Sequence, residues 1–292
     1  MRDRRTILQT LVIYVGALLL FVETVAPVLW MVISSISPGT ELLSHPIHWW
    51  PENPTFERYT SVFGIGEVSF RGNAVAAPAA AFLKALLNSC IIAISATVLC
   101  IFLAVPAVYA IARLDFKGRR HLVPMMIAFQ MLPAIATVVP LFAIFRQLHL
   151  TDTLFALIIT DTGVSLTYVI WLLVSYVRAL PIELEEAARI DGRSSFGAYF
   201  HITLRLAVPG IIAAGTVAFL NAWNEFLFAL VLTFTADSKP MPVVVSEFST
   251  RFGIDYGMMM TGGVLASLPP VLLAMAFQKY LVSGLASGAV KG

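Results

Sequence analysis

Long apolar runs alternate with polar segments along this chain. Six such runs stand out, and they cover residues 11–33, 81–111, 122–145, 154–177, 208–234 and 258–282. Because an α-helix rises about 1.5 Å per residue, each run is long enough to cross a hydrocarbon layer of roughly 30 Å. The pattern predicts an all-α integral membrane protein with six transmembrane helices.

The polar segments between the runs differ in character. Residues 37–78 are rich in Pro, Gly, Asn, Trp and Glu and include a short predicted helix near residues 56–63, and residues 235–257 form a second long loop. The third run contains three prolines, which remove intrahelical hydrogen bonds, and it is therefore expected to be kinked. The first run follows a basic N-terminus, but it is too long for the apolar part of a signal peptide and is interpreted as a retained helix.

Residues 181–209 form the one long charge-rich segment that lies between two apolar runs. Pro181 suits the first turn of a helix, and the glutamates that follow it favour the positive end of the helix dipole. Gly192 is expected to end this helix near Asp191, and the serines after it can accept the N–H bonds that begin a second helix. The segment, named the elbow from here on, is predicted to fold as a helix–turn–helix.

The two predicted helices of the elbow each carry a patterned face. At helical spacing, Glu186, Arg189 and Ile190 share one face of the first helix, and the alanines at positions 187 and 188 keep that helix thin. The second helix begins an apolar stripe at Phe196 that needs a surface to pack on. The pattern alone leaves two interpretations open: a docking surface for another subunit, or an amphipathic loop that folds back on the chain's own membrane helices.

Composition narrows the class of protein. Hydrophobic residues make up 59% and charged residues 12% of the 292 positions, and the mean hydropathy is +0.85, which excludes a soluble protein. The net charge of +2 comes without a long basic run, so no nucleic-acid partner is expected. No Gly-Lys pair occurs, and hence no P-loop that would hold ATP. No catalytic, metal-ligand or cofactor-binding set of residues is visible, so no enzyme activity is expected of this chain.

The distribution of Lys and Arg sets the predicted orientation. With both termini in the cytoplasm, the inner segments hold roughly twice as many Lys and Arg residues as the outer ones, as the positive-inside rule requires. The elbow then lies on the cytoplasmic side. The predicted domains are a cytoplasmic N-terminus at 1–10 and a single transmembrane domain at 11–292, with core helices at about 81–282, the elbow loop at 179–207 and a cytoplasmic tail at 283–292.

Polar side chains inside the apolar runs mark a candidate path for a solute. Asn221, Asn224 and Glu225 lie at i, i+3 and i+4, so one face of an unbroken fifth helix would present two amides and a carboxylate. Asn88 lies within the second run. Amides, carboxylates and aromatic groups suit the hydroxyls and apolar faces of a sugar, but a contact with a partner subunit explains the same pattern.

A second class of function also fits the polar residues. Glu23, Asp161 and Glu225 each lie inside an apolar run, where a carboxylate is costly unless it faces the protein or water. An ion-driven secondary transporter would use these three carboxylates as its relay. The two halves of the sequence show no evident repeat, however, and this hypothesis leaves the elbow unexplained.

The elbow resembles a known family motif. Glu186-Ala187-Ala188, three residues, Gly192, nine residues and then Ile202-Thr203-Leu204 match the EAA loop of the membrane subunits of binding-protein-dependent ABC importers. In that family the loop is a coupling helix that docks into a groove of the ATPase subunit. Arg205 departs from the motif, which usually has proline there. The resemblance implies that the ATPase-coupling residues are Glu186, Ala187, Ala188, Arg189, Asp191, Gly192 and Phe196.

Both ends of the chain resemble the maltose-type (MalG-like) sugar-importer permeases of this family. The resemblance lies in Trp50-Pro51 with Asn53-Pro54-Thr55, and in the glycine-rich residues 281–292. It implies the type I ABC importer permease fold in a bacterial or archaeal inner membrane, and transport of a sugar or sugar derivative. The implied partners are a larger (MalF-like) permease, an extracytoplasmic solute-binding protein and a dimer of ATPase subunits, which would hold the ATP and Mg.

Overall fold

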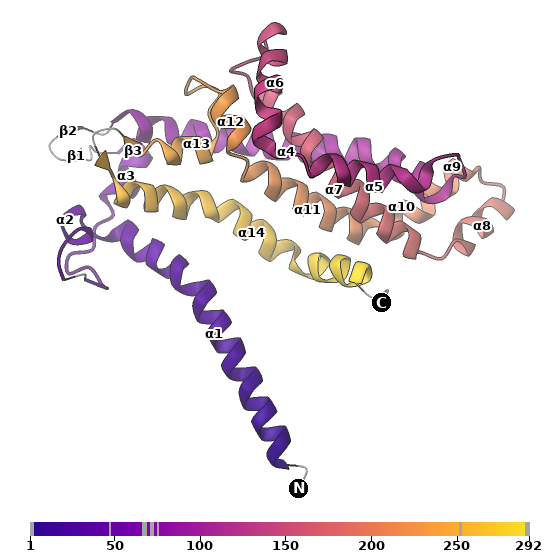
Figure 1. Cartoon of the computed structure of the whole chain (residues 1–292), viewed down its shortest axis with the longest axis horizontal. Coiled ribbons are helices and arrows are strands. Elements are labelled where there is room, and N and C mark those ends of the chain that lie inside the picture. The colour runs from indigo at the N-terminus through magenta and orange to yellow at the C-terminus, as the bar shows by residue number, and fades with distance from the viewer. Residues whose placement is uncertain are drawn as a thin grey trace. The chain divides into compact units, whose positions relative to one another are not determined.

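The computed structural model describes residues 3–46, 48–65, 69–70, 73–74, 76–250 and 253–289, and helices dominate it (Figure 1). The strands among these residues are four pieces of two residues each, which pair as antiparallel β1–β2 and β3–β4. The chain forms two compact units. The first consists of Met1–Leu83 and Val245–Ser267, and the second of Lys84–Val244 and Leu268–Gly292.

The first unit contains the first predicted membrane helix. Arg58 is 7% exposed, and its Nη1 donates hydrogen bonds to the carbonyl oxygens of Ser35, at 3.3 Å, and Ser37, at 2.6 Å. The guanidinium therefore connects α3 (Glu57–Val62), the helix that contains Arg58, to the end of α1 (Asp3–Ile36). That helix, α3, confirms the short helix expected near residues 56–63. The elements of this unit, besides the starts of α4 and α14, are α1 (Asp3–Ile36), α2 (Gly39–Leu42), α3 (Glu57–Val62), β1 (Ser69–Phe70), β2 (Asn73–Ala74), β3 (Ser249–Thr250) and β4 (Gly253–Ile254).

The second unit contains the elbow and the helices around it. Three of its helices, α4, α13 and α14, also extend into the first unit. Its elements are α4 (Ala76–Arg113), α5 (Arg119–Gln130), α6 (Ala134–Gln147), α7 (Leu154–Ala179), α8 (Glu183–Ile190), α9 (Ser195–Ala198), the π-helix η1 (Tyr199–Thr203), α10 (Leu204–Leu206), α11 (Val208–Trp223), α12 (Leu227–Leu232), α13 (Met241–Ser246) and α14 (Tyr256–Ala289).

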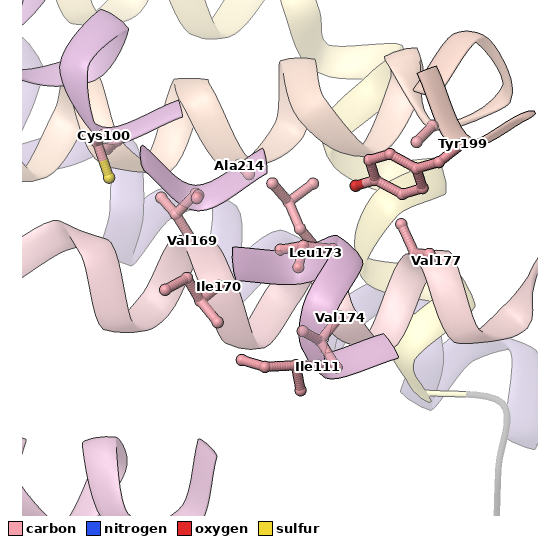
Figure 2. Close-up of a cluster of buried hydrophobic side chains, with 13 residues drawn as sticks. Cys100, Ile111, Val169, Ile170, Leu173, Val174, Val177, Tyr199 and Ala214 are labelled. Carbon is pink, nitrogen blue, oxygen red and sulfur yellow. The ribbon is translucent and has the colours of Figure 1, made fainter. Parts of the chain in front are cut away.

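The core of the second unit lies between α4, α7 and α11. Cys100 and Ala104 of α4, Val169 and Leu173 of α7 and Ala214 of α11 belong to one buried apolar cluster (Figure 2). Small side chains at such contacts let helix backbones approach closely, which is how membrane helices gain packing energy. This cluster forms the scaffold from which the elbow projects.

The number of membrane spans depends on two bent helix pairs. Among the described residues, four helices are long and apolar enough to cross a membrane alone, and counting each bent pair as one span brings the number to as many as six. The four are Gln9–Ile36, Ala81–Arg113, Leu154–Ala179 and Tyr256–Leu281, and the pairs are Arg119–Gln130 with Ala134–Gln147 and Ser195–Leu206 with Val208–Trp223.

The third apolar run is not the single kinked helix that its prolines predicted. It forms two helices, α5 and α6, whose axes differ by 91°. The chain leaves the helix after Gln130, and Pro133 lies in the extended conformation immediately before α6. The missing N–H does not by itself break a helix here, because Pro124 and Pro140 lie inside α5 and α6. The extended conformation of Pro133 takes the chain out of the helical path, so the interruption is complete rather than partial.

Candidate functional site

The elbow folds as the helix–turn–helix that its sequence predicts. α8 ends at Ile190, and Gly192 follows in the left-handed conformation with a φ of 89°, which residues with a side chain adopt only at a cost. The Ser194 side chain accepts a hydrogen bond from the Gly197 N–H at 3.1 Å and so caps α9. Pro181 differs from the expectation, because it lies before the first turn of α8 rather than in it.

One face of the elbow is exposed and carries most of the residues predicted to couple to an ATPase. Ile190 on this face is 86% exposed, whereas Ala188 is 7% exposed and faces inward. Phe196 is 55% exposed, but the centroid of its ring also lies 5.8 Å from that of Tyr109 on α4. Large apolar side chains set among charges on an exposed surface are typical of a protein interface. The exposed members of the predicted set are Glu186, Ala187, Arg189, Asp191, Gly192 and Phe196.

The opposite face of the elbow is buried and contains a charged network. Oε1 of Glu185 lies 2.6 Å from Nε of Arg113 at the end of α4, and the side chains of this ion pair are only 10% and 8% exposed. The same carboxylate oxygen accepts a hydrogen bond from Oγ1 of Thr203 at 2.5 Å. Sequence reasoning missed this network because the two charged partners lie 72 positions apart. The available signal was that Glu185 precedes the inward-facing Ala188 by three residues and so shares its side of α8.

An aromatic cluster completes the buried face. Tyr199 is 1% exposed, and its hydroxyl donates to the carbonyl oxygen of Val105 at 3.1 Å. The centroid of its ring lies 4.5 Å from that of Tyr109, and the ring reaches the core beside Val177 (Figure 2). The elbow therefore folds back on the chain's own helices with one face, while its other face stays exposed among the described residues.

Asn88, a candidate translocation-path residue, holds a loop in place. Its side chain is 2% exposed, and Nδ2 donates to the carbonyl oxygens of Asp237 and Lys239, each at 3.0 Å. The neighbouring Ser89 hydroxyl accepts a hydrogen bond from the backbone N–H of Met241 at 2.8 Å. These bonds fasten the segment before α13 to α4. A role of Asn88 in a solute path stays a prediction.

The three polar residues of the fifth apolar run do not share a helix face. Asn221 and Asn224 are exposed, and Asn224 ends α11 as its cap. Glu225 lies before the next helix and caps it, because its two carboxylate oxygens accept backbone N–H hydrogen bonds of 2.7 and 2.9 Å from the first turn of α12. The expectation of a single face is wrong because it required an unbroken helix. Whether these residues line a solute path stays a prediction.

The carboxylates of the ion-relay hypothesis lie in unlike surroundings. Asp161 of α7 is 3% exposed and Ser165, one turn further, is 2% exposed. Within the part of the chain that the structure describes, neither Oδ1 of Asp161 nor Oγ of Ser165 has a hydrogen-bond partner. Glu23, in contrast, is exposed on α1.

A second polar cluster, which sequence reasoning missed, lies at the end of α7 remote from the elbow (Figure 1). Asp152 accepts hydrogen bonds from the backbone N–H groups of Phe234, at 2.7 Å, and Thr235, at 3.1 Å. The hydroxyls of Thr235 and Ser238 also donate to this carboxylate. Partial burial alone would raise the pKa of Asp152, but the hydrogen bonds outweigh it and lower the pKa to about 2. The carboxylate therefore fixes the loop that follows α12.

Comparison with known proteins identifies the family. Residues 96–287 match the model of the binding-protein-dependent transport system inner membrane component, and the chain belongs to that family. The sulfoquinovosyl glycerol transport system permease protein SmoH of Agrobacterium fabrum is 34% identical over 279 residues, which cover 96% of this chain and 93% of SmoH. The trehalose/maltose transport system permease protein MalG of Thermococcus litoralis is 32% identical over 290 residues, which cover 99% of each chain. A solved bacterial ABC transporter involved in the import of the acidic polysaccharide alginate shares the fold, with a TM-score of 0.77 and 20% identity over 96% of this chain and 99% of that one.

Family membership defines the class of activity. The chain is a permease subunit of a binding-protein-dependent importer, a multi-pass protein of the inner membrane and not an enzyme. A permease of this family works with a partner permease, an ATPase and a solute-binding protein. The ion-driven secondary transporter is not favoured, because relatives along nearly the whole chain are permeases of transport systems of this family.

Proposed function

We propose that the chain forms half of the translocation pathway for a sugar or sugar derivative. Two of the relatives that cover nearly the whole chain are named for sulfoquinovosyl glycerol and for trehalose and maltose, and each of these compounds is a sugar or carries one. A MalF-like permease forms the other half. The solute-binding protein docks on residues 37–78 and 235–257. Measuring the affinity of that binding protein for each sugar of a panel identifies the solute that the importer transports.

The elbow couples this permease to ATP hydrolysis. The proposal rests on the two faces of the elbow. Ile190 on one face is 86% exposed, whereas the opposite face is anchored by the buried Glu185–Arg113 ion pair. A rigid projection of this kind suits a groove on an ATPase subunit. The ATP and Mg are bound by the ATPase dimer and not by this chain. Closure of the dimer on ATP moves the elbow and opens the permease outward.

Two variants of the elbow test this function. Glu186→Lys reverses a charge on the exposed face, and Gly192→Pro demands a φ near −65° where Gly192 has 89°. Both are expected to leave the subunit inserted, to loosen its association with the ATPase and to lower ATP-driven uptake into proteoliposomes at least about tenfold, the effect of about 1.4 kcal/mol. Glu183→Lys is the matched control, because it reverses a charge on α8 outside the motif. Uptake at the wild-type level in both elbow variants would contradict the proposal.

We further propose six spans with both termini in the cytoplasm, so that the elbow lies inside. The test labels single cysteines with a membrane-impermeant maleimide, in a chain whose Cys90 and Cys100 are replaced by Ala. Ile190→Cys, at a position 86% exposed, is expected to react only in permeabilised cells. Asp237→Cys, whose native side chain is 87% exposed, is expected to react in intact cells. The reverse pattern would overturn this orientation.

A further inference from the structure

We propose that Glu185 is a positioning residue that fastens the elbow to α4, so that the elbow and α4 move as one body when the ATPase closes. The proposal rests on the proposed function of the elbow as the coupling element. It assigns a role to a residue that lies outside the face predicted to meet the ATPase.

The elbow is attached at three points along one side of α4. Val105, Tyr109 and Arg113 follow one another at intervals of four residues and therefore lie on one face of that helix. The Tyr199 hydroxyl donates a hydrogen bond to the Val105 carbonyl oxygen, and the Tyr199 ring packs on Tyr109. Glu185 forms the ion pair with Arg113. Eight residues of helix separate the outer two points by about 12 Å. Contacts this far apart prevent the elbow from pivoting on α4.

Both helices of the elbow share this attachment. Glu185 belongs to α8, whereas Tyr199 and Thr203 are the first and last residues of η1. Thr203 Oγ1 donates, at 2.5 Å, to the carboxylate oxygen that also meets Arg113. One carboxylate therefore joins α8, η1 and α4. A π-helical turn is rare and is frequently found at functional sites, in agreement with a specialised role for η1.

Burial makes this joint stiff. The Arg113 and Glu185 side chains are 8% and 10% exposed, and separating them would leave each buried charge without its counter-charge and with little water to replace it. Each group would keep one neutral hydrogen-bond partner, the Leu180 carbonyl oxygen for Arg113 and the Thr203 hydroxyl for Glu185. Arg119 and Asp115 form another ion pair at the same end of α4, with a separation of 3.5 Å, but the Asp115 side chain is 94% exposed. Such a pair separates easily because water replaces the lost contact. Asp115→Asn is therefore a matched control.

The first test follows the distance between the elbow and α4 in the assembled importer. Nitroxide labels are placed at Glu183 of α8 and at Phe102 of α4, both exposed, in a chain whose Cys90 and Cys100 are replaced by Ala. In the otherwise wild-type chain, the distance measured by electron paramagnetic resonance is expected to stay the same with and without a non-hydrolysable ATP analogue. In Glu185→Ala, the distance is expected to shift and its distribution to broaden when the analogue binds.

The second test compares solute uptake with ATP hydrolysis in proteoliposomes. Radiolabelled trehalose is the first probe, and if the wild type does not take up trehalose, a sugar from a panel that the wild type does take up replaces it. Glu185→Ala and Arg113→Gln are expected to hydrolyse ATP but to take up at least about tenfold less solute per ATP. Replacing both charged residues by Gln is expected to impair this ratio less than Arg113→Gln alone, because no buried charge is then left unpaired. Asp115→Asn is expected to leave the ratio unchanged.

Thr203→Val keeps the proposal testable if Glu185→Ala does not assemble. It removes one hydroxyl, keeps the shape of the side chain, and is expected to lower uptake per ATP about two- to fivefold, the effect of one hydrogen bond. An unchanged label distance and an unchanged ratio in the assembled variants would overturn the role of Glu185. If the elbow is not the coupling element at all, Glu186→Lys instead keeps full ATPase association and uptake, so the two failures are distinguishable.

Discussion

Replacing Asp152 is expected to loosen the loop after α12 while the helices around it stay intact. The carboxylate accepts the N–H hydrogen bonds of Phe234 and Thr235 at 2.7 and 3.1 Å. Asp152 has a φ of 61°, in the left-handed region that Asp and Asn tolerate better than other residues with side chains. Asp152→Asn therefore changes only the charge and the hydrogen bonds, whereas Asp152→Ala also strains the backbone.

The pKa of Asp152 sets the size of the effect. Its fall from 3.8 to about 2 corresponds to at most about 2.5 kcal/mol of stabilisation, because one pKa unit is worth about 1.4 kcal/mol. The side chain is partly exposed and solvent screens its charge, so about 1 kcal/mol is expected for Asp152→Asn. Alanine in the left-handed region adds about 1 kcal/mol, which gives about 2 kcal/mol for Asp152→Ala.

The contribution of Asp152 depends on pH in a defined direction. A carboxylate whose pKa is lower in the folded state stabilises the fold fully above its unfolded pKa, near 4. That stabilisation is lost as the pH falls through the folded pKa of about 2. The difference in stability between the wild type and Asp152→Asn is therefore complete at neutral pH and shrinks between about pH 4 and pH 2.

Amide hydrogen exchange of Phe234 and Thr235 at neutral pH measures this effect locally. Losses of about 1 and 2 kcal/mol predict exchange about fivefold faster in Asp152→Asn and about thirtyfold faster in Asp152→Ala. Asp237→Asn is the control, because this carboxylate lies in the same loop and its side chain is 87% exposed in an ion pair with Lys84. Exchange at the wild-type rate in both Asp152 variants would refute the reasoning.

Two glycine replacements test the packing of side chains inside each of the two units, one replacement in each unit. Gly257→Ala places a Cβ 2.0 Å from the guanidinium carbon of Arg58, so it is expected to displace that buried side chain and to destabilise the protein by about 1–3 kcal/mol, measured as a lower melting temperature in detergent. Gly210→Ala places a Cβ 2.7 Å from the Tyr176 ring and is expected to lower the melting temperature similarly. Gly215→Ala is the control, because the nearest atom to its Cβ, on Thr97, would be 3.7 Å away. Equal melting temperatures for the Gly210 and Gly215 variants would contradict the close packing of α11 on α7.

Local chemistry made the shape of the elbow predictable, but not its attachment. Gly192 ends α8 through its own backbone conformation, and Ser194 caps α9 through an N–H three residues away. Both effects act within one turn, so the sequence contains all the information they need. The pairing of Glu185 with Arg113 depends on how α8 packs against α4, and no pattern within either helix encodes that contact.

Hydropathy predicted the apolar runs but not where their helices are interrupted. The run at residues 208–234 is apolar on both sides of the short break between α11 and α12, so its average hydropathy does not register the break. Glu225 was assigned to a continuous helix face because periodicity assumes an unbroken helix, whereas the carboxylate caps α12. The three prolines predicted a kink in the third run, but not the complete break between α5 and α6, and the 91° angle depends on where α6 packs.

The adjacent glutamates of α8 show how one short helix serves two surfaces. Successive residues in an α-helix are rotated by about 100°, so Glu185 and Glu186 do not point the same way. Glu185 is buried against Arg113, whereas Glu186 is exposed. The buried charge fixes the rotation of α8 about its own axis, because any turn of the helix would separate an ion pair where no water replaces the contact. The exposed face is thereby held in one orientation, which is what a rigid docking surface requires.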